Sequence, residues 1–73
     1  MLLRRMRDLR EDGDLTQTQV GAAINVPQRT YSYYETGRRG VPPEVLIALA
    51  EFYGTSVDYL LNLTDEKTPY PRK

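Results

Sequence analysis

The chain of 73 residues is long enough for one domain with a small hydrophobic core. It has no cysteine and no histidine, which removes disulfides, thiolate and imidazole metal ligands and the usual general base, so we expect no metal, no cofactor and no enzymatic activity. Ten basic and ten acidic side chains give a net charge of zero, and the longest apolar run, residues 45–50, is too short to span a membrane. Arg4 and Arg5 interrupt the apolar start, which argues against a secretion signal and favours a cytoplasmic protein.

The charges are unevenly distributed along the chain. Residues 1–40 hold seven arginines and five acids, residues 41–66 hold five acids and no base, and residues 67–73 add three bases. A net charge of zero is unfavourable for binding nucleic acid, because phosphate binding depends on counterion release. The arginine excess nevertheless gives the first part of the chain a basic character.

Apolar spacing and turn residues predict five short helices and no strand. The first covers residues 2–12, ends at Gly13 and carries Arg10 on the flank of its apolar face. The second starts with the segment Thr16-Gln-Thr-Gln19, which has the form of a capping box. It ends at Asn25, a residue that tolerates the left-handed backbone of a tight turn.

The third predicted helix starts at Pro27 and ends at Gly37. Tyr31 and Tyr34 share its apolar face, whereas its opposite side is polar. Two short helices joined by a tight turn, the second with a polar outer face, form the arrangement that places a helix in the major groove of DNA. The second and third helices are therefore a candidate DNA-binding unit.

The fourth predicted helix leads from Pro42-Pro43 to Gly54, and the fifth runs from Val57 to about residue 62, after a cap at Ser56. The fourth helix is apolar almost all round. We expect its core face to consist of Leu46, Ile47, Leu49, Ala50 and Tyr53. A second apolar stripe on the same helix is formed by Val45, Ala48 and Phe52.

A monomer of this size rarely buries two faces of one helix. The sequence therefore predicts a contact with a second copy or a protein partner, through apolar side chains of the fourth helix or near the carboxyl end: Val45, Ala48, Phe52, Leu60, Leu61 and Leu63. The alternative is that the tail, with Tyr70 between two prolines, folds back over the stripe.

Four segments of the chain carry a family resemblance. They read LTQTQVGAAINV at residues 15–26, YSYYETG at 31–37, LAEFYG at 49–54 and SVDYLL at 56–61. Together they resemble the phage repressor and Cro-like helix-turn-helix family over residues 2 to about 63. The resemblance implies an all-α, compact, five-helix lambda-repressor-like domain at residues 1–63 and a tail at residues 64–73.

The same resemblance implies a bacterial or phage transcriptional regulator, more often a repressor, that binds an operator on double-stranded DNA. A homodimer formed through the apolar contact would combine two modest arginine patches on a near-palindromic operator with half-sites one helical turn apart, which answers the objection from net charge. Two alternatives stay open. One is an antitoxin-type regulator that also binds a protein partner. The other is a protein-interaction module that keeps the fold without strong DNA binding, which the net charge of zero would suit.

The resemblance also implies roles for single residues. The positions that read base edges in the family correspond to Gln28, Arg29, Ser32 and Tyr33. Positions that contact the DNA backbone correspond to Gln17, Thr16, Thr18, Arg38 and Arg39. Arg10 and Glu35 correspond to a structural ion pair. The chemistry suits base reading, because Gln pairs with adenine and Arg with guanine through two hydrogen bonds each, although a solvated helix face would have a similar composition.

The chain departs from the family pattern at a few positions. Gly21 stands where alanine is usual, which costs helix stability, and Asn25 stands where glycine is usual. Tyr31 and Tyr34 replace aliphatic side chains, so the core is larger and two hydroxyl groups need partners.

Overall fold

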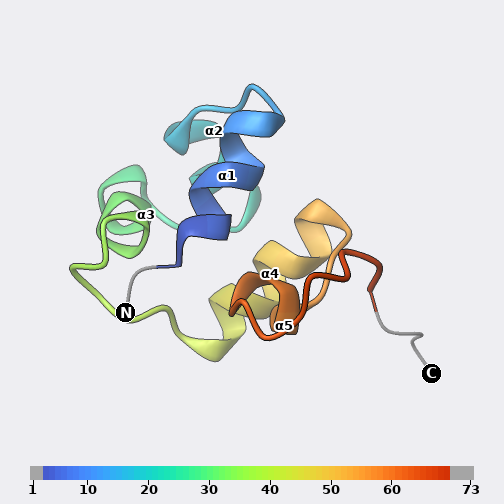
Figure 1. Cartoon of the computed structure of the whole chain (residues 1–73). Coiled ribbons are helices and arrows are strands. Elements are labelled where there is room, and N and C mark those ends of the chain that lie inside the picture. The colour runs from blue at the N-terminus through green and yellow to red at the C-terminus, as the bar shows by residue number, and fades with distance from the viewer. Residues whose placement is uncertain (1–2, 70–73) are drawn as a thin grey trace.

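The computed structural model describes residues 3–69 and contains, within that range, five helices and no strand (Figure 1). The helices are α1 (Arg4–Asp12), α2 (Gln17–Ala23), α3 (Gln28–Glu35), α4 (Pro43–Tyr53) and α5 (Val57–Leu60). The all-α, five-helix fold expected from the sequence is confirmed. The first helix starts after Leu3, later than predicted.

The first helix, α1, connects two pairs of helices (Figure 1). It packs against α3 and against α5, while α2 packs on α3 and α4 packs on α5. The core between them is formed by Leu3, Met6, Val20, Ile24, Tyr31, Tyr34, Val45, Leu46, Leu49, Ala50 and Leu60. None of the helices within residues 3–69 combines the length and the apolar character needed to cross a membrane.

Side-chain hydrogen bonds start two of the helices as the sequence predicts. In the capping box of α2, the N–H of Gln19 donates to Thr16 Oγ1 at 3.1 Å, and the N–H of Thr16 donates to Gln19 Oε1 at 2.8 Å. At α5, the N–H of Tyr59 donates to Ser56 Oγ at 3.0 Å. Both helices are short, so these caps supply a large share of their end hydrogen bonds.

A common backbone arrangement closes all five helices of the described chain. A residue with left-handed backbone, φ between 56° and 78°, follows each helix: it lies two positions after the end of α1, α2, α3 and α5, at Asp14, Asn25, Gly37 and Asn62, and directly after α4, at Gly54. The next N–H then donates to the carbonyl five residues earlier, as from Val26 to Gly21 at 2.8 Å and from Arg38 to Tyr33 at 2.9 Å. The left-handed residue after α1 is Asp14, since Gly13 has an ordinary φ of −88°.

The glycine inside α2 is explained by the turn that follows the helix. Gly21 is buried, and a Cβ atom built on it would lie 2.7 Å from the carbonyl oxygen of Val26. A side chain here would push the turn away from α2. The absent Cβ thus lets α2 and α3 approach closely, at the cost in helix propensity noted above.

The fourth helix buries Leu46, Leu49 and Ala50 as predicted, but its buried face differs from the predicted one at two positions. Val45 is 8% exposed and lies in the core, whereas Ile47 is 51% exposed. Both assignments were wrong because the buried face is centred on Leu49, and the apolar pattern of a helix that is hydrophobic almost all round does not fix its rotation.

The predicted apolar contact surface is consequently smaller. Val45 and Leu60, which is 1% exposed, belong to the core and cannot contribute to an interface. Among the remaining candidates, Phe52 is 43% exposed, Leu63 is 72% exposed, and Ala48 and Leu61 are partly buried. The alternative that the tail covers this surface rests on Tyr70, which lies outside the described residues.

An arginine of α1 holds the start of the tail. Arg5 donates to the carbonyl oxygens of Tyr59, at 2.9 Å, and Thr64, and pairs with Asp65 at 2.7 Å. Its guanidinium also lies 4.0 Å from the centroid of the Tyr59 ring. The chain after α5 is therefore tied back to the first turn of α1, a contact for which the sequence gives no recognisable signal.

Candidate nucleic-acid interface

The third helix has one buried side and one open side. Tyr31 and Tyr34 are buried in the core and fix the rotation of α3. Gln28 and Arg29 are exposed at its amino end, and Ser32 and Tyr33 are half-buried one turn later. All four residues that the resemblance assigns to base reading therefore belong to α3. Gln28 and Arg29, which have long polar side chains, are exposed to solvent.

The amino end of α2 is connected to this face by a glutamine. The side-chain amide of Gln28 donates to Gln17 Oε1 at 2.8 Å, and that of Gln17 donates to Glu35 Oε1 at 3.4 Å. Thr16 and Thr18 on either side are exposed. The structure thus brings Gln17, one of the predicted backbone-contact residues, into hydrogen-bond contact with Gln28, the first residue of α3.

The predicted pair between Arg10 and Glu35 is present and largely buried. Arg10 Nε and Nη2 donate to the two carboxylate oxygens of Glu35 at 2.9 and 2.8 Å, with side chains 15% and 4% exposed. Arg10 also donates to the carbonyl of Leu15 at 3.0 Å. The bidentate pair joins α1 to the carboxyl end of α3, and the bond to Leu15 joins α1 to the turn before α2.

Protonation of this pair is shifted by its surroundings. Burial acts to raise the pKa of Glu35. The hydrogen bonds from Arg10 and Gln17 lower it and together outweigh burial, so the pKa of Glu35 lies below its usual value. The same hydrogen bonds to Glu35 raise the pKa of Arg10. Both groups are therefore charged at neutral pH.

The buried Tyr31 and the half-buried Tyr53 border the pair. Burial raises the pKa of Tyr53 to about 12 and raises that of Tyr31 further. Neither hydroxyl donates a hydrogen bond to another residue in the described part of the chain. The enlarged core expected from Tyr31 is confirmed, and its hydroxyl stays neutral at physiological pH.

The turn after α3 carries two arginines that surround one aromatic ring. Arg38 and Arg39 are exposed, and neither forms an ion pair with a carboxylate within residues 3–69. Their guanidinium carbons lie 5.6 and 5.2 Å from the centroid of the Tyr33 ring. The two positive charges therefore remain available to an anion.

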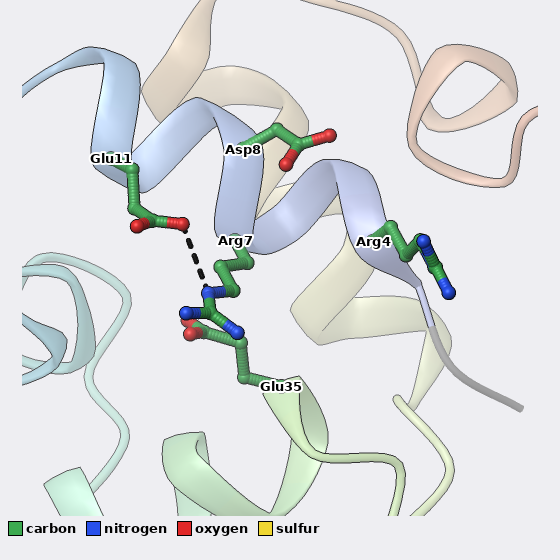
Figure 2. A pocket seen from close by; sticks show the side chains of 5 residues that line it. All are labelled: Arg4, Arg7, Asp8, Glu11 and Glu35. Carbon is green, nitrogen blue, oxygen red and sulfur yellow. Dashed lines mark hydrogen bonds and ion pairs between the residues drawn. The ribbon is translucent and has the colours of Figure 1, made fainter.

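A cleft of about 390 Å³ lies beside α1 and the end of α3. It is lined by Arg4, Arg7, Asp8, Glu11 and Glu35 (Figure 2). Arg7 Nε pairs with Glu11 at 2.9 Å, and Figure 2 shows the guanidinium between Glu11 and Glu35. The acidic side chains of the cleft do not form a cluster that could hold a metal ion, and no such cluster exists elsewhere among the described residues. The mixed charges offset one another, so the cleft favours no ligand class.

A helix-turn-helix domain family matches residues 2–63 of the chain. The chain belongs to this family. Its α2 and α3, joined by the turn at Asn25, are the two helices after which the family is named, and the phage-repressor type expected from the sequence is confirmed.

Two relatives of known source match most of this helix-turn-helix chain. The uncharacterized HTH-type transcriptional regulator YobD of Bacillus subtilis (strain 168) is 38% identical over 69 residues, which are 94% of this chain and 62% of that protein. The cryptic phage CTXphi transcriptional repressor RstR of Vibrio cholerae is 37% identical over 62 residues, 85% of this chain and 56% of that protein. The chain spans less than two thirds of the length of either relative.

Two solved structures share the helix-turn-helix fold. The P22 c2 repressor protein, crystallised in complex with the synthetic operator 9T, superposes with a TM-score of 0.75 at 28% identity, over 82% of this chain and 92% of that chain. The solution structure of the DNA-binding domain of the P22 c2 repressor gives a TM-score of 0.76 at 27% identity, over 96% of each chain.

Proposed function

We propose that this helix-turn-helix chain binds double-stranded DNA sequence-specifically as part of a transcriptional repressor, with α3 in the major groove. The observation that carries the proposal is the exposure of Gln28 and Arg29 on a helix whose opposite side is anchored by Tyr31 and Tyr34. A rigidly held helix with open polar side chains can present them to base edges in one register. The similarity to two phage repressors, one solved with an operator, supports the same function.

Each exposed residue of the proposed interface has a role that fits its chemistry. Gln28 suits adenine and Arg29 suits guanine, since each can make two hydrogen bonds to that base in the major groove. Ser32 adds a shorter donor and acceptor one turn further along α3. At the amino end of α2, Thr16, Gln17 and Thr18 would contact the DNA backbone, where the helix dipole also favours a phosphate.

We include a homodimer in the proposal. Each subunit offers few positive charges to DNA, so two subunits on a near-palindromic site would combine two modest contacts, with half-sites about 34 Å apart. The exposed Leu63 and Phe52, with the partly buried Ala48 and Leu61, are the predicted apolar side chains left for the subunit contact. Sedimentation that stays monomeric at high micromolar concentration, with and without operator DNA, would remove the dimer from the proposal.

A protein partner is the second candidate function, favoured by the exposure of Phe52 and Ile47 on α4. It corresponds to an antitoxin-type regulator or an interaction module with weak DNA binding. Changing Phe52→Asp and Arg29→Ala separately distinguishes the two functions in cells. Loss of regulation with Arg29→Ala supports DNA binding, whereas loss only with Phe52→Asp supports the partner. Neither function requires catalysis, and we propose none.

Amide shift mapping by NMR tests where DNA binds. Isotope-labelled protein is titrated with a random-sequence duplex at low salt, which samples the non-specific mode of binding. We expect the largest shifts at residues 16–19, 28–33 and 38–39, with small shifts along residues 44–52 of α4. Shifts concentrated on α4 and α5, or no shifts at a duplex excess, would contradict the proposed interface.

A further inference from the structure

Tyr33 differs from the other residues that the resemblance assigns to base reading. Its ring is half-buried and lies within cation–π distance of two guanidinium groups, those of Arg38 at 5.6 Å and Arg39 at 5.2 Å. Neither arginine has a carboxylate partner within residues 3–69. The aromatic ring is therefore the main group that restrains these two long side chains.

The backbone of Tyr33 holds the same two residues. Its carbonyl oxygen accepts hydrogen bonds from the N–H groups of Arg38, at 2.9 Å, and Arg39, at 3.2 Å. Gly37, directly before Arg38, has a φ of 78°, which allows the chain to reverse over the end of α3. Main chain and side chain of one residue thus set the position of both arginines.

We propose that Tyr33 is a positioning residue that holds Arg38 and Arg39 ready for the phosphates of double-stranded DNA. This inference rests on the proposed function, because it names how the same interface meets the DNA backbone. Two like charges on adjacent residues repel each other, and the negative face of an aromatic ring lowers the cost of keeping them together. Restraining long arginine side chains before binding reduces the conformational entropy lost when they contact phosphates.

The proposal separates the ring of Tyr33 from its hydroxyl. A base-reading tyrosine would act through its hydroxyl or its edge in the groove, and Tyr33→Phe would then change sequence preference. A positioning tyrosine acts through the face of its ring, which phenylalanine retains and leucine does not. Tyr33→Phe and Tyr33→Leu are therefore a matched pair of variants.

The first experiment needs no DNA. Protons of an arginine side chain held over an aromatic face shift upfield in the NMR spectrum. We expect this shift for the Arg38 and Arg39 side chains in the wild type and in Tyr33→Phe, and its loss in Tyr33→Leu. Unshifted resonances in the wild type would overturn the inference and leave the proposed DNA binding untouched.

The second experiment measures affinity for a random-sequence duplex at several salt concentrations. We expect Tyr33→Leu to weaken binding roughly threefold to tenfold and Tyr33→Phe to keep it within about twofold. The loss should be smaller when Tyr33→Leu is made in an Arg38→Ala, Arg39→Ala background, since the positioned groups are then absent. Equal losses of affinity in both backgrounds would overturn the inference. So would a base preference of Tyr33→Phe that differs from the wild type when the fragments each protein retains from a random duplex pool are sequenced.

Unfolding curves for each variant show whether a loss of affinity comes from lost structure. Absence of binding by the wild type, with the upfield shifts present, would contradict the proposed function while leaving the arrangement of ring and arginines intact. The two failures are therefore distinguishable.

Discussion

At the scale of single residues, the buried carboxylate of Glu35 accepts hydrogen bonds from side chains of two other helices beside the proposed interface. Arg10 of α1 and Gln17 of α2 donate hydrogen bonds to Glu35, and Gln28 donates to Gln17. The buried carboxylate therefore orients Gln28, the first residue of α3, through Gln17. The sequence predicted the pair of Arg10 with Glu35 through the family resemblance. It did not predict the link through Gln17, because two glutamines eleven residues apart have no pattern that marks a contact.

Truncating Arg10 should be much more costly than truncating an exposed arginine of the same helix. Arg10→Ala leaves the Glu35 carboxylate buried without its main partner, and we expect a loss of about 3 kcal/mol in the free energy of unfolding. Arg7→Ala, which breaks the exposed pair with Glu11, is the matched control and should cost about 0.5 kcal/mol. Similar losses in urea unfolding of the two variants would show that the buried pair contributes no more than a surface pair.

The lowered pKa of Glu35 makes the contribution of this pair dependent on pH. A carboxyl whose pKa is lower when folded stabilises the fold fully above its unfolded value of about 4.3, and this stabilisation is lost as pH falls through the folded value. Wild type should therefore exceed Glu35→Gln in stability by a constant amount between about pH 7 and pH 5. Below about pH 4 the difference should narrow. A difference that stays constant down to pH 3 in urea unfolding would contradict this assignment.

At the scale of helices, the ends were easier to predict than the faces. The capping box at Thr16, the cap at Ser56 and the left-handed turn at Asn25 depend on a few neighbouring residues, and all three are present. The face that α4 buries depends on how the other helices dock, and its nearly uniform hydrophobicity contains no such information. The errors at Val45 and Ile47 have this common origin.

Gly54 and Gly40 allow the cost of a left-handed backbone to be measured separately from the cost of a steric clash. An added Cβ would meet no atom within 4 Å at either Gly54 or Gly40, but only Gly54 has left-handed backbone, with φ of 65°. We expect Gly54→Ala to cost about 1–2 kcal/mol of stability through strain alone. Gly40→Ala, the control, should change stability little. Thermal unfolding measures both, and equal midpoints would contradict the role of Gly54 in ending α4.

At the scale of the whole molecule, the net charge of zero and the proposed DNA binding are compatible because the charges are segregated. The exposed arginines of the interface are Arg29, Arg38 and Arg39, while residues 41–66 carry only acids. The resemblance predicted that these arginines belong to one interface. The common contact of Arg38 and Arg39 with the ring of Tyr33 was not predictable, since it depends on the turn that reverses the chain after α3.

This small number of interface cations predicts a weak dependence of DNA binding on salt. Each phosphate neutralised contributes about −0.9 to the slope of log K against log salt concentration, so a dimer with three arginines per subunit, six in all, should give a slope no steeper than about −5.4. Arg38→Gln removes one cation from each subunit and should reduce the magnitude of the slope by about 1.8, whereas Arg4→Gln on α1 should not change it. A wild-type slope near −10 would require basic contacts that this interface lacks.

Selection of bound fragments from a random duplex pool tests the central claim most directly. The purified chain, Gln28→Ala and Arg29→Ala are each incubated with the pool at low and moderate salt, and the retained DNA is sequenced. We expect the wild type to enrich an inverted repeat with half-site centres about one helical turn apart, and each variant to relax the preference at a separate base pair. No enriched sequence at either salt, or the same sequence enriched by all three proteins, would contradict base reading by α3.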